Sequence, residues 1–217
     1  QYTTYALNGC GNGELMIGGE ALYVLDQAGK LQQVGSTSPY TLIGTIDRTQ
    51  IEEAPCRGFL CAQRWLVLLT DALTLGEFPS REVYICDMEQ NSSISIDKEY
   101  IIDVCLYRED QCLLLCYEND AYVLYTYVFA SGSLVKYEVL GAEEVACITY
   151  YEPEDKIYFV KASSLWCQQK SDPPRQEGFT PWQQLRYDVF AFTTGAGVLG
   201  LYTNDEIILY TLTQDAE

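Results

Sequence analysis

The sequence has 217 residues, 48% of them hydrophobic, so it can bury a substantial core, and we expect a single domain over residues 1–217. Its 31 acidic and 13 basic residues give a formal net charge of −18. That charge repels phosphate backbones and anionic lipid headgroups, so nucleic acid and membrane surfaces are poor expected partners. It would attract a partner protein with a basic surface, or it serves only to keep the domain soluble.

Strands are the expected secondary structure throughout the chain. Helical periodicity is almost absent, whereas short runs of Tyr, Val, Ile, Leu and Thr recur between turn residues. Tyrosine alone occurs 18 times, which favours β-structure. The first expected strand is 2–7, and the chain then settles into a repeated pattern.

One unit, two apolar strands joined by a polar turn, occurs five times in chain order. The copies are GELMIGGEALYVLD from Gly13, WLVLLTD from Trp65 with EVYICD from Glu82, CLLLCYENDAYVLYTY from Cys112, KIYFVKASSLWCQQK from Lys156 and VLGLYTNDEIILYTL from Val198. Their first strands centre on Met16, Val67, Leu114, Phe159 and Leu199, so successive steps are 51, 47, 45 and 40 residues. A four-stranded propeller blade repeats every 40 to 50 residues or so, which fits this spacing.

Further strands flank these units. We expect YIIDVCLYRED, EVACITYYEPED and YDVFAFTTG to supply the innermost strands before the third, fourth and fifth units. We expect KLQQV, SISID, SLVKYEV and TPWQQL to supply the outer strands after the first four. The sequence therefore predicts an all-β fold, a β-propeller of about five four-stranded blades. Either 2–7 closes the ring against the last blade, or the chain is part of a larger propeller.

The paired strands resemble blades of the WD40-like propeller superfamily over nearly the whole chain. CLLLCYENDAYVLYTY and VLGLYTNDEIILYTL are similar to the central strands of such blades, although the Gly-His and Trp-Asp dipeptides of that family are absent. GELMIGGEALYVLDQAGKL is also similar to one blade of the citron-homology type, found in signalling kinases, exchange factors and vesicle-tethering subunits. Both resemblances imply a scaffold that holds other proteins.

The cysteines favour a reduced, cytoplasmic setting. Nine cysteines cannot all pair, and several lie inside apolar runs. We expect no metal and no cofactor, since the chain has no histidine and no C-x-x-C pair. A secreted protein is the alternative, because Cys56 and Cys61 look close enough to bridge and Asn91-Ser92-Ser93 is a glycosylation sequon. The start at Gln1, without a leader, suggests a processed chain or part of a longer one.

Standard enzyme chemistry finds no support in the residues. A histidine-based nucleophilic triad is impossible, and neither a G-x-S-x-G pattern nor a phosphate loop is present. Three carboxylates are weighed as a channel site: Asp103 and Asp188 enter the expected inner strands at matching positions, with Glu144 one residue out of register. Facing a channel, they could bind a cation, seat a basic side chain or hydrolyse a glycoside, and the alternative is solvated strand ends.

The loops that join the paired strands should converge on one face of a propeller and form a mostly acidic rim. Its longest loop, from Asp71 to Ser80, carries apolar side chains that either meet a partner or fold back. The candidate partner-binding residues are Glu20, Asp71, Leu73, Leu75, Glu77, Phe78, Glu118, Asp120, Asp205 and Glu206.

Two functions follow from these patterns. The first is a non-catalytic protein-interaction scaffold, a propeller module of a larger assembly that binds other protein subunits through its loop face. The second is a secreted propeller that binds or hydrolyses carbohydrate with Asp103, Glu144 and Asp188.

Overall fold

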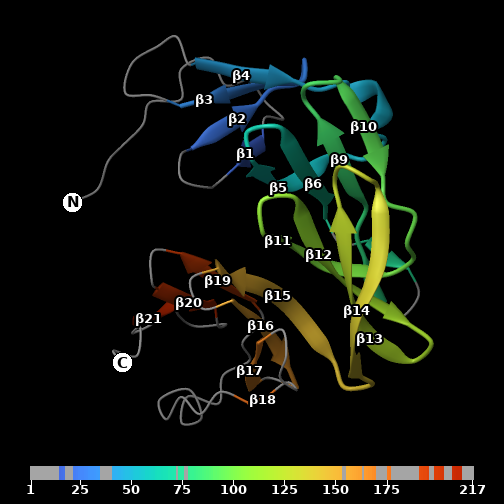
Figure 1. The fold of residues 1–217 in the computed structure, drawn as a ribbon, viewed down its shortest axis with the longest axis vertical. Coiled ribbons are helices and arrows are strands. Elements are labelled where there is room, and N and C mark those ends of the chain that lie inside the picture. Colours follow the sequence, from blue (N-terminus) through green and yellow to red (C-terminus); the bar gives the residue numbers. More distant parts are fainter. Residues whose placement is uncertain are drawn as a thin grey trace. The chain divides into compact units, whose positions relative to one another are not determined.

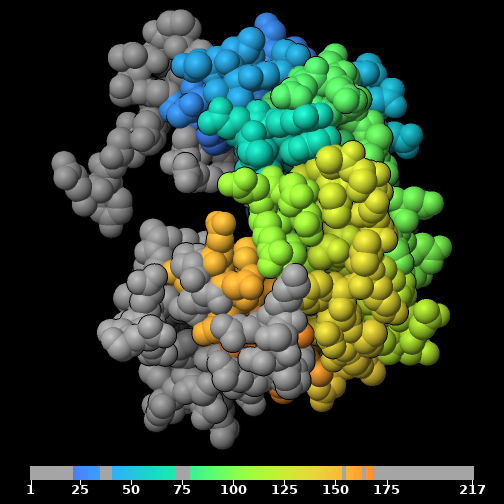
Figure 2. Space-filling view, in the orientation of Figure 1, coloured from blue at the N-terminus to red at the C-terminus, as the bar shows by residue number. Residues whose placement is uncertain are grey.

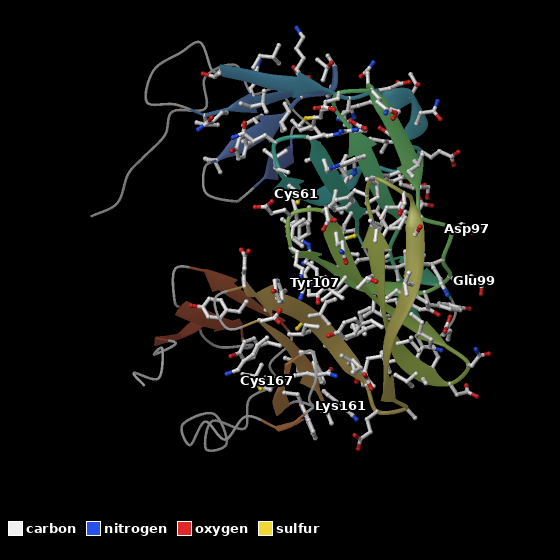
Figure 3. All side chains as sticks on the ribbon, in the orientation of Figure 1. Cys61, Asp97, Glu99, Tyr107, Lys161 and Cys167 are labelled. Carbon is white, nitrogen blue, oxygen red and sulfur yellow. The ribbon has the colours of Figure 1, made fainter. Side chains whose placement is uncertain are left out.

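The structure is a computed structural model that describes most of the chain in two compact units. Unit 1 comprises Gln1–Lys98, coloured blue to green in Figure 1, and unit 2 comprises Glu99–Glu217, coloured green to red. Asp97 and Glu99, on either side of this boundary, are labelled in Figure 3. The described residues are 15–17, 22–34, 41–71, 73–75, 78–152, 155–162, 164–169, 175–176, 191–195, 198–202 and 207–211.

Unit 1 begins with a four-stranded antiparallel sheet. Its strands follow chain order: β1 (Leu15–Ile17), β2 (Tyr23–Leu25), β3 (Lys30–Gln33) and β4 (Thr41–Thr45). The expected outer strand KLQQV is therefore wrong by one place, because it is the third strand and β4 is the edge. The edge was missed because Thr41, Leu42 and Thr45 are all exposed, so β4 lacks the alternation that marks a half-buried strand.

A second sheet in unit 1 has the strand order β10-β9-β6-β5. A short 3-10 helix, η1 (Arg48–Gln50), precedes it, and its strands are β5 (Pro55–Cys61), β6 (Trp65–Thr70), β9 (Val83–Asp87) and β10 (Ser92–Ser95). The segment expected to be a long loop contains a hairpin of β7 (Leu73–Leu75) and β8 (Phe78–Ser80). Extended pairing replaces a bare loop there because it satisfies backbone polar groups.

Unit 2 contains three antiparallel sheets that follow chain order. The first comprises β11 (Ile101–Tyr107), β12 (Gln111–Glu118), β13 (Ala121–Val128) and β14 (Ser133–Gly141). The second comprises β15 (Val145–Tyr151), β16 (Lys156–Lys161), β17 (Ser164–Gln169) and β18 (Arg175–Gln176). The third comprises β19 (Ala191–Gly195), β20 (Val198–Tyr202) and β21 (Ile207–Thr211). The expected outer strand TPWQQL lies outside the described residues.

Burial explains why the middle strands of each sheet are continuously apolar. In β12 the run from Cys112 to Cys116 is fully buried, as is the run from Leu66 to Leu69 in β6. Such strands are covered on both faces and need no alternation. The edge strands β10 and β14 instead alternate toward solvent, with Ile94, Val135 and Val139 each about half exposed.

Each unit has its own hydrophobic core between successive sheets. In unit 1, Leu25 and Leu31 of the first sheet pack with Leu66, Leu68 and Tyr84 of the second. In unit 2, the cluster joins the first two sheets, and Tyr117, Tyr137, Tyr150 and Trp166 pack against its margin. Sheets that stack face to face in this way are expected of a repeat architecture in which one sheet cannot bury its faces alone.

None of the eight cysteines in the described residues is in a disulfide. Cys56 is exposed, and the other seven described are buried, among them Cys61 at the far end of the same strand. The expectation that Cys56 and Cys61 can bridge is wrong: five residues apart along β5, at about 3.3 Å per residue, they lie about 16 Å from each other, beyond the limit of about 7 Å. Among the described residues, no helix has the length and apolar character needed to cross a membrane.

Candidate partner-binding surface

Three connecting segments meet at one end of unit 2. The turn between β12 and β13 lies beside the β14–β15 connection, because Tyr122 pairs with Gly141. The β16–β17 turn joins them through the amide of Ala162, which donates to the carbonyl oxygen of Glu144 at 3.0 Å. We call this place the acidic end, and its carboxylates are Glu118, Asp120, Glu143 and Glu144.

The sequence forms the β12–β13 turn because two of its residues tolerate left-handed backbone. Asn119 and Asp120 have φ values of 48° and 59°, and Glu118 pairs with Ala121 across them. Two-residue hairpins with positive φ at both central positions match the twist of the strands, and Asn and Asp adopt that conformation more readily than most residues. The turn therefore holds the Asp120 side chain out in solvent.

Glu118 is anchored where the turn begins. Its carboxylate accepts a hydrogen bond from the Tyr125 hydroxyl and lies 3.5 Å from the Lys136 ammonium. The side chain is 24% exposed, so one edge of the carboxylate faces solvent. Because Tyr125 and Lys136 fix this group, a ligand at the acidic end would meet a preorganised acceptor.

Lys161 is the cation held deepest at this end, and it is labelled in Figure 3. Its ammonium donates to the carbonyl oxygen of Leu140 at 2.9 Å, pairs with Glu143 at 3.1 Å and lies 5.5 Å from the centre of the Trp166 ring. The side chain is only 17% exposed, so its positive charge mainly neutralises Glu143. The outward field of the acidic end therefore comes mainly from Asp120 and Glu144.

Burial raises the pKa of Tyr122 above its ordinary value, and the negative charge of Glu144 adds to the effect. The Tyr122 ring packs edge-on against Tyr117, with centroids 5.0 Å apart. Tyr122 is 6% exposed and belongs to the core, whereas Tyr117 is half-buried. This end therefore combines negative charge with the partly exposed ring of Tyr117, a combination that attracts Lys and Arg side chains.

The three carboxylates weighed as a channel site do not share one register. Asp103 lies four residues before Tyr107, where β11 ends, and the same position in β15, which ends at Tyr151, is Cys147. Glu144 precedes β15 altogether, so it is three residues out of register and not one. Both strands carry a bulge at the equivalent place, between Ile101 and Asp103 and between Val145 and Cys147, so Asp103 and Cys147 stay aligned. Asp188 lies outside the described residues.

Asp103 is a buried structural acceptor. It is 6% exposed, and its Oδ2 atom accepts a hydrogen bond from the backbone amide of Ile148 at 3.0 Å. Asp103 belongs to β11 and Ile148 to β15, so the carboxylate joins the first strands of two sheets in unit 2. An amide on the open edge of a strand needs a partner when it is buried, and Asp103 supplies that partner.

The other predicted rim residues are only partly described. Asp71 is exposed directly after β6, and Leu73, Leu75 and Phe78 lie in the β7–β8 hairpin, with side chains outside the described part of the structure. Four further rim residues lie outside the described part of the chain: Glu20, Glu77, Asp205 and Glu206.

Two residues of the acidic end, Glu143 and Lys161, were not among those predicted from the sequence. The adjacent pair Glu143-Glu144 after SLVKYEVL was the available signal. No group of three metal-ligating side chains occurs in the part of the chain that is described.

Comparison with known proteins places the fold. No protein-family model and no curated protein sequence matches the chain. A chain in the crystal structure of a nidogen/laminin complex is 12% identical over 92% of this chain and 75% of its own, with a TM-score of 0.58. A gluconolactonase candidate is 12% identical over 90% and 72%, with a TM-score of 0.57. Ycf48 bound to a D1 peptide is 8% identical over 92% and 78%, with a TM-score of 0.50.

These likenesses decide the architecture and nothing finer. The chain has a β-propeller fold. The all-β propeller expected from the repeat spacing is therefore confirmed, with four four-stranded sheets and one three-stranded sheet among the described residues. Membership of the WD40-like or citron-homology groups stays a prediction, as do closure of the ring and the single domain.

Proposed function

We propose that this propeller is a non-catalytic protein-interaction module of a larger assembly and that it binds a partner through the acidic end of unit 2. The observation that carries the proposal is the meeting of three connecting segments there, with Asp120 and Glu144 exposed beside the Tyr117–Tyr122 pair. Propellers use such clustered loops as binding surfaces because a rigid scaffold positions them.

The partner surface is basic. The net charge of −18 draws a positively charged protein toward the chain and speeds its encounter. Two similar structures give a precedent for protein binding by this fold, since one comes from a nidogen/laminin complex and the other was solved with a D1 peptide. The precedent belongs to those proteins, and the charge is what connects it to this chain.

A non-catalytic role agrees with the placement of the carboxylates. Asp103 is buried and already bonded to the Ile148 amide, while Glu144 is exposed and outside β15, so the two do not form a pair poised for acid–base chemistry. The same proposal puts the protein in the cytoplasm, because seven of the described cysteines are buried thiols. Burial raises the pKa of Cys86 to about 11, which keeps that thiol protonated.

The test is charge reversal at the acidic end. The double variant Asp120→Lys, Glu144→Lys changes two exposed side chains, and the matched control Glu109→Lys, Glu152→Lys changes two exposed carboxylates at the opposite turns of unit 2. Immobilised wild-type chain and both variants are incubated with extract from the source cells at 50 and 300 mM salt, and captured proteins are quantified by mass spectrometry.

We expect the acidic-end variant to lose at least tenfold of a defined set of captured proteins that the control retains. Capture of that set should also fall with salt, because exposed charges are screened. Equal capture by all three chains would refute binding at the acidic end. A far-ultraviolet circular dichroism spectrum identical to wild type establishes that both variants are folded.

A further inference from the structure

A polar side chain sits where the core of unit 2 should be apolar. Gln168 of β17 is 3% exposed, and its amide nitrogen donates to a carboxylate oxygen of Glu138 in β14 at 3.4 Å. Its amide oxygen is buried and has no hydrogen-bond partner among the described residues. Leaving such a group unpaired costs about 1 to 3 kcal/mol, so its retention calls for a reason.

A β-bulge brings Glu138 and its neighbour to this place together. In the β13–β14 ladder, Leu124 pairs with Glu138 and Tyr125 pairs with Lys136, so Tyr137 has no cross-strand partner. The bulge turns both Tyr137 and Glu138 toward the second sheet of unit 2, where Tyr137 packs on the core and Glu138 reaches Gln168. Bulges re-aim side chains in this way and are common beside functional sites.

The Tyr137 hydroxyl completes the group. It is buried and makes no hydrogen bond of good geometry among the described residues, although it interacts with the Tyr107 hydroxyl. Burial raises the pKa of Tyr137 to about 12, and the interaction with Tyr107 adds to the rise, so the phenol stays neutral at physiological pH. Its ring meets Tyr107 edge-on, with centroids 6.1 Å apart, which holds the hydroxyl in place.

The acceptors among these three groups indicate the chemistry of a ligand, although one donor that is also unpaired among the described residues, the buried indole N–H of Trp166, lies two residues from Gln168 on β17. The Gln168 oxygen and the Glu138 carboxylate are acceptors, and the Tyr137 oxygen can accept as well. No ion pair among the described residues includes Glu138, so its charge is not compensated there by Lys or Arg. A flat cation with several N–H donors fits best: a guanidinium can bond both acceptors at once and stack on the tyrosine ring.

Only Tyr137 and Glu138 connect this group to the outer edge of the sheet: the Gln168 oxygen and the Tyr137 hydroxyl have almost no exposed surface, so a guanidinium reaches them only when neighbouring side chains shift. Tyr137 and Glu138 are half-buried, and β14 is the edge strand of its sheet, seen in yellow in Figures 1 and 2. Val135 lies on the same face of β14 as Glu138, because their partners Thr126 and Leu124 are two residues apart. Val135 is 53% exposed and offers an apolar contact for the methylene stem of an arginine.

We propose that the seam between β14 and β17, formed by Tyr137, Glu138 and Gln168, binds an arginine side chain of a partner protein. The guanidinium donates to the Gln168 oxygen and the Glu138 carboxylate, and Val135 covers the stem. This site rests on the proposed protein-binding function and adds to it a specific basic residue, at a place separate from the acidic end.

The experiment is a titration of the full chain, labelled with nitrogen-15, with N-acetyl-arginine methylamide. The side-chain amide of Gln168 and the indole of Trp166, two residues away on β17, are the reporters. We expect a saturable shift of the Gln168 amide with the arginine derivative, and at least tenfold weaker binding of the neutral isostere N-acetyl-citrulline methylamide. Glu138→Gln should weaken arginine binding at least fivefold, and the matched control Glu99→Gln, at an exposed carboxylate, should leave it unchanged.

Each opposite result is informative. Equal shifts with arginine and citrulline, or wild-type binding by Glu138→Gln, would overturn the seam site. Equally tight binding of N-acetyl-lysine methylamide would overturn its preference for a guanidinium. The acidic-end variant Asp120→Lys, Glu144→Lys should bind the arginine derivative normally. A negative titration result would therefore not affect the capture test of the acidic end, and a negative capture result would not affect the titration.

Discussion

Two carboxylate clusters, one in each unit, differ in how completely their polar atoms are paired. Asp87 in unit 1 is 4% exposed and accepts from the Arg64 guanidinium at 3.1 and 2.6 Å and from the amides of Glu89 and Gln90 at 2.9 and 3.3 Å. Glu138 in unit 2 receives one long hydrogen bond from Gln168, whose own oxygen is unpaired among the described residues.

The difference separates a structural cluster from a candidate binding cluster. A buried carboxylate whose two oxygens are both hydrogen-bonded within the fold contributes to folding and offers little to a ligand. The Arg64 guanidinium is likewise engaged within the protein, since it also pairs with Glu89 at 2.8 Å and lies 4.6 Å from the centre of the Trp65 ring. A cluster with unpaired acceptors lowers the free energy of unfolding of the unliganded chain, and a ligand that donates hydrogen bonds to those acceptors raises it again.

The largest expected effect comes from breaking the complete cluster. Asp87→Ala removes the acceptor for four hydrogen bonds and leaves Arg64 without its buried partner, so the free energy of unfolding should fall by about 3 kcal/mol. Urea unfolding followed by tryptophan fluorescence measures it. The control Glu89→Gln, at a side chain 66% exposed, should cost less than about 0.5 kcal/mol. A loss below about 1 kcal/mol for Asp87→Ala would show that the cluster is not structural.

The next effect concerns the paired carboxylate of unit 2. Asp103→Ala leaves the buried Ile148 amide without an acceptor and should lower the free energy of unfolding by about 2 kcal/mol. Asp103→Asn keeps an acceptor oxygen and should cost about half as much. Glu144→Ala, at an exposed residue, should cost less than about 0.5 kcal/mol. Equal losses for Asp103→Ala and Glu144→Ala in urea unfolding would remove the structural role of Asp103.

A smaller effect of opposite sign tests the incomplete cluster. Gln168→Met replaces a buried, half-paired amide by an apolar side chain of similar size, so the free energy of unfolding should stay unchanged or rise by up to about 1 kcal/mol. Arginine binding at the seam should be lost at the same time. A fall in stability beyond about 1 kcal/mol would mean that Gln168 is fully satisfied in solution and that the two clusters do not differ.

The sequence predicts the clusters unequally because they depend on different levels of structure. The apolar runs around Val67, Leu114 and Phe159 gave the strands and their spacing, since burial on both faces leaves a local signature. The exposed turn at Asp120 was also foreseeable, because turn residues act locally. These features needed no knowledge of how sheets stack.

The seam was beyond sequence reasoning for a physical reason. Alternation in LWCQQ puts Trp166 and Gln168 on one face of β17, but whether that face is buried depends on the packing of a neighbouring sheet. The bulge at Tyr137 leaves no mark in SLVKYEV, so the sequence alone would place Tyr137 and Glu138 on opposite faces.

The smallest expected effect is a pH dependence confined to the complete cluster. Hydrogen bonds from Arg64 lower the pKa of Asp87 below its ordinary value, so the unfolded chain binds the proton more readily than the folded one. The resulting stabilisation is fully present above the unfolded pKa of about 3.9 and is lost as the pH falls through the lower folded value. The difference in free energy of unfolding between wild type and Asp87→Asn should thus be constant above about pH 5 and shrink below about pH 4.

A second variant, Arg64→Met, keeps the Asp87 carboxyl but removes its main hydrogen-bond donor. Urea unfolding from about pH 3 to about pH 7, which covers the range in which Asp titrates, should show that this variant has lost the same pH-dependent part of the stability. A difference that is identical at both ends of that range would mean that the Arg64–Asp87 pair does not hold the proton off Asp87, and the contrast between the two clusters would then rest on hydrogen-bond geometry alone.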